Sequence, residues 1–131
     1  MSNESPQILL IEGDHTLLEI TEFRLELLGY EVISRDSAER ALEWLADKLP
    51  STIIVDHVLP GMDGIEFINR LSNDTRTNNI PIMFLSTNGD LEDVQKAYNA
   101  GADEYLVIPY DPLVLEAKVE RLTSAHALVN A

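Results

Sequence analysis

Five short apolar runs recur along the chain, and each is followed by a longer segment with helical spacing. The runs occupy residues 8–11, 31–34, 52–55, 81–85 and 104–108. Four of the five are nearly continuous rather than alternating, which is typical of strands buried on both faces of a parallel sheet. Each crossover is long enough for a parallel connection, so the pattern predicts a doubly wound α/β sheet.

The segments between the runs carry apolar or small residues three and four positions apart, which predicts the helix faces that meet the sheet. The expected faces are Leu17, Leu18, Thr21, Leu25 and Leu28; Ala38, Ala41, Leu42, Leu45 and Leu49; Ile65, Ile68 and Leu71; Leu91, Val94 and Tyr98; and Leu113, Ala117, Glu120 and Ser124, with Val114 and Leu122 beside the last line. We expect one domain over residues 1–131, with an ordered core at about 7–123.

The charge and amino-acid composition of the chain exclude several classes of function. The net charge of −14 argues against direct binding of nucleic acid or an anionic membrane, because these surfaces are bound through Lys and Arg. The 131 residues include no cysteine, so neither a disulfide nor a thiolate metal site can form. No apolar stretch approaches a membrane span, and MSNESPQ does not resemble a secretory signal, so we expect a cytoplasmic location.

Polar residues follow the predicted strands at the edge where open α/β sheets bind ligands. Glu12 and Asp14 follow the first strand, Asp56 the third, and Ser86 and Thr87 the fourth. Converging carboxylates repel each other unless a cation joins them, and Mg²⁺ suits such oxygen ligands. A carboxylate beside Mg²⁺ can accept a phosphoryl group, and the Ser86 hydroxyl could then contact a phosphoryl oxygen. Asp is also a common turn former, but acids and hydroxyls from three strands favour a functional site.

The stretch DHVLPGMDG (56–64) resembles the phosphoacceptor loop of receiver domains from bacterial two-component response regulators, D-x-x-(L/M)-P-x-M-D-G. ILLIEGD (8–14), IPIMFLST (80–87) and GADEYLVIPYDP (101–112) resemble further motifs of that family, in the same order. The resemblance implies a flavodoxin-like fold with five parallel strands in the order 2-1-3-4-5 and five helices.

The resemblance also implies roles for single residues. Asp56 matches the phosphorylated aspartate, Ser86 the switch hydroxyl and Tyr105 the switch aromatic. Glu12 and the backbone carbonyl of Val58 match metal ligands. Pro109 matches a proline that usually follows a cis peptide bond.

Two positions depart from the family pattern. Gly13 stands where the second metal-binding acid is expected, and Ile108 stands where a lysine normally holds the phosphoryl group. Mg²⁺ binding is therefore expected to be weak or absent. Asp14 either folds back as a replacement ligand or only caps the following helix. The two departures remove one negative and one positive charge, so the local charge balance is kept.

These features predict a receiver domain in a phosphorelay that is not an enzyme beyond self-phosphorylation and autodephosphorylation at Asp56. The expected partners are a sensor histidine kinase or a phosphotransfer protein. A self-dimer or an output partner would use the face formed by the helix near residues 91–98, the strand 104–108 and the last helix. Tyr105 and Tyr98 are the expected aromatic anchors on that face, although Tyr98 is equally compatible with a core position on its helix. The alternative is a pseudo-receiver that binds partners without phosphorylation; a flavin carrier fits less well, because no phosphate-binding loop follows the first strand.

Overall fold

The computed structural model describes residues 5–129, with side-chain environments through Ser124. Five strands and five helices alternate: β1 (Gln7–Ile11), α1 (His15–Leu27), β2 (Glu31–Arg35), α2 (Ala38–Leu45), β3 (Thr52–Asp56), α3 (Gly64–Ser72), β4 (Ile82–Ser86), α4 (Leu91–Ala100), β5 (Glu104–Val107) and α5 (Pro112–Val129). All strand pairs are parallel, in the order β2-β1-β3-β4-β5. The predicted flavodoxin-like topology is confirmed.

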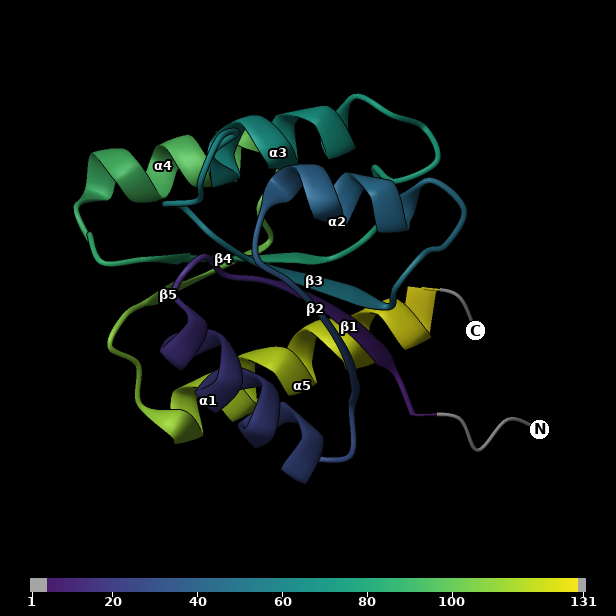
Figure 1. Ribbon diagram of the computed structural model, residues 1–131, viewed down its shortest axis with the longest axis vertical. Coiled ribbons are helices and arrows are strands. Elements are labelled where there is room, and N and C mark those ends of the chain that lie inside the picture. Colours follow the sequence, from purple (N-terminus) through teal and green to yellow (C-terminus); the bar gives the residue numbers. More distant parts are fainter. Residues whose placement is uncertain (1–4, 130–131) are drawn as a thin grey trace.

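The sheet is covered on both faces (Figure 1). Helices α2, α3 and α4 cover one face, and α1 and α5 cover the other. Each face has its own apolar cluster, one around Phe67 and Phe84 and the other around Leu25 and Val119. The central strands β3 and β4 are buried at every residue, as their continuous apolar sequences predict. No helix in residues 5–129 is long and apolar enough to cross a membrane.

Three helix faces differ from expectation. Helix α2 ends at Leu45, and Leu49 is half exposed. The Arg76 guanidinium from the 73–79 loop donates hydrogen bonds to the carbonyls of Leu45 and Lys48. That loop, which reads as a simple polar connection, therefore stabilises the end of α2.

The last two helices are also rotated relative to the expected faces. Helix α4 buries Ala97 and Ala100, whereas Leu91 is 80% exposed and Tyr98 is 41% exposed. Small residues are favoured there because α4 approaches α3 closely: the Ser72 hydroxyl donates to the Ala100 carbonyl at 2.7 Å. Helix α5 buries Leu115, Val119 and Leu122 instead of the line that includes Leu113 and Ala117, because this stripe carries more apolar area to the sheet.

Candidate phosphoacceptor site

The carboxyl edge of the sheet brings together the acids and the hydroxyl predicted to meet there. Asp56 is the last residue of β3, Glu12 follows β1, and Ser86 is the last residue of β4. All three are nearly inaccessible to solvent, with exposures of 7%, 1% and 4%. Parallel pairing of β1 with β3 aligns Ile11 with Val55, so Glu12 and Asp56 leave adjacent strands at the same level.

Glu12 is a buried acid without full hydrogen bonding. Burial is the largest cause that raises its pKa from 4.5 to about 8, and a hydrogen bond with Asp56 and the charge of Asp56 add to it. The Asp14 backbone N–H donates to Glu12 Oε2 at 3.1 Å and acts in the opposite direction. Glu12 Oε1 has no hydrogen-bond partner among the described residues. Burial beside Asp56 therefore favours the protonated form of the Glu12 carboxyl.

The loop after β3 is closed by backbone contacts that bring it beside the acids. The Gly64 N–H donates to the His57 carbonyl at 2.9 Å, and a side chain at Gly64 would place its Cβ 2.3 Å from the Asp56 carbonyl oxygen. Only glycine permits this close approach. On the far side of the loop, the Glu39 carboxylate of α2 accepts a hydrogen bond from the Met62 N–H at 2.9 Å. This bond is the largest cause that lowers the pKa of Glu39.

Gly13 lies where a metal-binding side chain would reach this loop. A Cβ atom at Gly13 would lie 3.6 Å from the Val58 carbonyl oxygen and 3.2 Å from Pro60 Cδ. An acid at this position would therefore be directed toward the Val58 carbonyl. Asp14 does not replace it in this structure, because its carboxylate caps α1 by accepting a hydrogen bond from the Leu17 N–H at 3.1 Å.

The oxygen atoms at this edge fit a magnesium ion only in part. Glu12, Asp56 and the Val58 carbonyl supply hard oxygen donors, and the unpartnered Oε1 of Glu12 is available for a ligand. However, among the side chains that the structure describes, through Ser124, no group of three or more acidic, histidine or cysteine residues is arranged to hold a metal ion. Gly13, the position that the family resemblance matches to a second metal-binding acid, has no side-chain oxygen.

Ile108 is part of the core rather than of a polar site. Its side chain is 8% exposed and belongs to the apolar cluster on the α1 and α5 face. Its N–H donates to the Ser86 carbonyl at 2.8 Å, which extends the β4–β5 pairing past the end of β5. The peptide bond from Ile108 to Pro109 is cis, as the family resemblance predicts. Ile108 offers no donor to a phosphoryl group.

Tyr105 is turned into the molecule, so the expectation that it is an exposed aromatic anchor is wrong. Its side chain is 6% exposed, and its hydroxyl donates a hydrogen bond to the Asn88 carbonyl in the loop after β4. The Asn88 N–H in turn donates to Ser86 Oγ at 3.1 Å. The Tyr105 ring lies 5.7 Å from the Phe84 ring, and Phe84 lies 5.3 Å from His57. Contacts through Asn88 thus connect the two residues matched to the switch, Ser86 and Tyr105.

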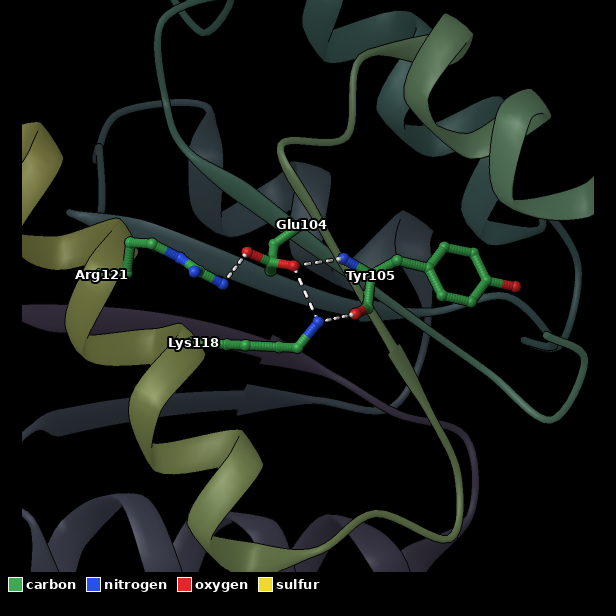
Figure 2. Close-up of polar contacts among 4 residues, drawn as sticks. All are labelled: Glu104, Tyr105, Lys118 and Arg121. Carbon is green, nitrogen blue, oxygen red and sulfur yellow. Dashed lines mark hydrogen bonds and ion pairs between the residues drawn. The ribbon is translucent and has the colours of Figure 1, made fainter. Parts of the chain in front are cut away.

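A charged group on β5 and α5 was not anticipated from the sequence (Figure 2). Lys118 donates to Glu104 Oε1 at 2.8 Å and to the Tyr105 carbonyl at 2.6 Å, and Arg121 donates to Glu104 Oε2 at 2.6 Å. Burial raises the pKa of Glu104, but the hydrogen bond and charge of Lys118 and the hydrogen bonds from the Tyr105 N–H and Arg121 outweigh it, so the pKa is lowered overall. The only sequence signal for this group was that Lys118 and Arg121 lie three residues apart on the helix that follows the strand containing Glu104.

Comparison with known proteins identifies the family. Residues 8–120 match the response regulator receiver domain family. The chain is 32% identical over 114 residues to the phosphate regulon transcriptional regulatory protein PhoB of Escherichia coli strain K12, covering 87% of this chain and 50% of that protein. It is 32% identical over 117 residues to the transcriptional regulator RpaA of Synechocystis, covering 89% of this chain and 48% of that protein. The chain therefore spans about half the length of these curated relatives.

Solved structures agree with this assignment. A putative response regulator from Chloroflexus aurantiacus superposes with a TM-score of 0.88 at 32% identity, covering 92% of this chain and 98% of that one. The receiver domain of a histidine kinase from Syntrophus aciditrophicus gives a TM-score of 0.86 at 30% identity, with 92% of each chain covered. This chain belongs to the receiver domain family of response regulators in two-component signalling.

Proposed function

We propose that Asp56 is the phosphoacceptor of this receiver domain and that it accepts a phosphoryl group slowly unless a protein donor assists. The proposal rests on one observation: Asp56 and Glu12 lie together, buried, at the carboxyl edge of the sheet, where Ser86 ends the neighbouring strand. In the reaction, a carboxylate oxygen of Asp56 attacks the phosphorus of a phosphohistidine. The P–N bond breaks, the imidazole nitrogen keeps the electron pair and takes a proton, and an acyl phosphate forms on Asp56.

The residues around Asp56 have separate tasks in this proposal. The Ser86 hydroxyl would contact a phosphoryl oxygen, and the bond from Asn88 to Ser86 would transmit its position to Tyr105. A magnesium ion, held weakly by Glu12, Asp56 and the Val58 carbonyl, would neutralise charge on the phosphoryl oxygens. Since burial favours the protonated form of Glu12, binding a cation there would also displace a proton.

The missing groups make the reaction slow. Removing one preorganised donor to a developing charge typically costs about 10²–10³ in rate, and Ile108 supplies none. A poorly held metal adds to this loss, so a total of roughly 10³–10⁴ relative to a complete site is expected, equivalent to about 4–6 kcal/mol. A histidine kinase or phosphotransfer protein would offset part of the loss through its own contacts.

An output partner or a second copy would bind the surface of α4, β5 and α5. Its exposed apolar residues are Leu91, Tyr98, Val107, Leu113 and Val114. Tyr98 lies close enough to Glu104 for that charge, after burial, to raise the Tyr98 pKa. Its 41% exposure supports the role of an aromatic anchor rather than a core residue.

The second candidate function is a pseudo-receiver that binds partners without phosphorylation. The observation that favours it is Ile108, whose buried side chain gives this edge of the site an apolar core residue instead of a cation.

Intact-mass spectrometry after incubation with a small phosphodonor and Mg²⁺ separates the two functions. The proposal expects a slow gain of one phosphoryl group, lost in Asp56→Asn and retained in Asp63→Asn, a matched aspartate that caps α3. If no phosphoryl group is gained from the small donor or from a panel of histidine kinases, the pseudo-receiver is the correct function.

A further inference from the structure

Helix α1 carries apolar residues on two opposite faces. Thr21 and Leu25 face the sheet and are buried. On the other side, Ile20, Phe23 and Leu27 are 46%, 60% and 68% exposed. Contiguous large apolar residues on the surface of a small domain indicate an interaction site rather than chance exposure.

The exposed residues have the spacing of a helix–helix interface. Thr16, Ile20, Phe23 and Leu27, all exposed, follow one another at intervals of four, three and four residues. This is the spacing of the positions that interlock in a two-stranded coiled coil. We call these four residues the α1 seam. The sheet does not cover the seam, because the seam lies on the side of α1 opposite Leu25, and its residues stay exposed among the residues that the structure describes.

The charges beside the seam fit a second copy of the same helix. Glu19 flanks one side of the seam and Arg24 flanks the other, both exposed. Neither makes an ion pair with another residue in the part of the chain that the structure describes. In a parallel pair of helices, a residue at the position of Glu19 faces the residue five positions later on the partner helix. That residue is Arg24 of the second copy, and symmetry forms the pair twice.

We propose that two copies of this chain associate through parallel packing of their α1 seams about a two-fold axis along the helices. Antiparallel packing is disfavoured, because it sets Glu19 of one copy near Glu26 of the other. The association must be weak. A single pair of 13-residue helices buries less than the roughly 1,200 Å² of a stable interface, and each chain carries a net charge of −14. Dissociation constants in the micromolar to millimolar range follow.

This contact does not depend on phosphorylation of Asp56, and it uses a different surface from α4, β5 and α5. A dimer through the α1 seam would leave Tyr98 and Val107 free for an output partner, because α1 lies on the opposite face of the sheet from α4 (Figure 1).

Sedimentation equilibrium of the full chain, at physiological salt and up to millimolar concentration, tests the proposal. Wild type should form dimers as its concentration rises. Phe23→Glu should weaken association by at least about tenfold, because it places charge in the centre of the seam. Leu49→Glu is the matched control: Leu49 is 50% exposed after α2, outside both proposed surfaces, and its substitution should leave association unchanged.

A charge exchange tests the parallel orientation without removing apolar contacts. Glu19→Arg and Arg24→Glu should each weaken association by about tenfold, because each creates two like-charge contacts. The double exchange should restore wild-type affinity. Circular dichroism checks that each variant keeps its helices. A wild-type monomer at millimolar concentration overturns the proposal, as does a dimer that Phe23→Glu weakens no more than Leu49→Glu does. A double exchange that stays weak overturns the parallel arrangement.

Discussion

At the scale of single residues, burial of Glu12 reduces the charge repulsion with Asp56 that a bound metal ion would otherwise reduce. Its carboxyl is almost fully enclosed beside Asp56, and protonation removes one of two charges that would otherwise repel each other. This arrangement makes the folded state prefer the protonated acid, which gives stability a definite dependence on pH.

We predict that Glu12→Gln changes this dependence. The pKa of Glu12 is about 8 when folded and near 4.5 when unfolded, so the folded state binds one more proton between these values. Wild type should therefore lose stability as pH rises through this interval, by up to a few kcal/mol. The neutral glutamine removes this loss, so the variant gains relative to wild type as the pH rises. Urea unfolding in metal-free buffer at both ends of this pH interval measures the free energy of unfolding of each protein. An equal change with pH in wild type and Glu12→Gln would contradict the raised pKa of Glu12.

The two departures from the family pattern predict a coupled pair of substitutions. Gly13→Asp adds an acid directed toward the Val58 carbonyl, but the Pro60 ring must shift slightly to admit the new Cβ. Ile108→Lys adds a cation, but it buries the stem and charge where Ile108 now packs in the apolar cluster. Each single variant should therefore react slowly, since one crowds acids and the other leaves the metal poorly held.

The double variant should be phosphorylated at Asp56 faster than the product of the two single effects, because both groups act on one phosphoryl ligand. The rates of Asp56 modification by a small phosphodonor with Mg²⁺ in all four proteins give the test. A wild type that already reacts as fast as the double variant would show that the site is not impaired.

At the scale of secondary-structure elements, the sequence predicts the five strands but not the buried faces of the last two helices. The apolar runs predict all five strands, because a buried parallel strand needs a continuous apolar sequence. The faces of α4 and α5 could not be read correctly from spacing alone. Close packing of α4 on α3 selects Ala97 and Ala100 over the larger Leu91, and only the three-dimensional contact reveals this.

Some residues at the site and near it could likewise be predicted from the sequence, and others could not. Asp56, Glu12 and Ser86 were predictable because each directly follows or ends a strand at the same edge. The Glu104 group with Lys118 and Arg121 depends on how α5 folds back over β5, which residue spacing along the chain does not specify (Figure 2).

Arg76 provides a prediction at this scale. Its guanidinium satisfies carbonyl groups at the end of α2, so Arg76→Ala should lower the free energy of unfolding by about 1–2 kcal/mol. Arg70→Ala is the control, because Arg70 only forms an exposed pair with Glu66 at 3.1 Å and should cost at most about 0.5 kcal/mol. Chemical denaturation of both variants checks the difference; equal losses would show that the α2 contact contributes nothing special.

At the scale of the whole molecule, the charge of −14 opposes compaction. Only nine Lys and Arg residues balance 23 acids, and several of those cations are engaged within the chain, including Lys118 and Arg121. Acids on the surface therefore repel each other over distances of about a Debye length, which is near 8 Å at physiological salt. Added salt screens this repulsion in the folded state, where the charges are closest together.

We therefore predict that the unfolding midpoint rises with NaCl concentration, and that MgCl₂ at matched ionic strength raises it only slightly further. A ligand stabilises the folded state according to its concentration relative to its dissociation constant, so a weak Mg²⁺ site adds little beyond screening. Asp56→Asn separates the two effects, because it removes a metal-binding carboxylate and leaves the rest of the surface charge in place. The small extra effect of MgCl₂ should disappear in this variant while the response to NaCl remains. A large extra stabilisation by MgCl₂ in wild type, lost in Asp56→Asn, would mean that Glu12, Asp56 and the Val58 carbonyl bind the ion tightly without an acid at Gly13.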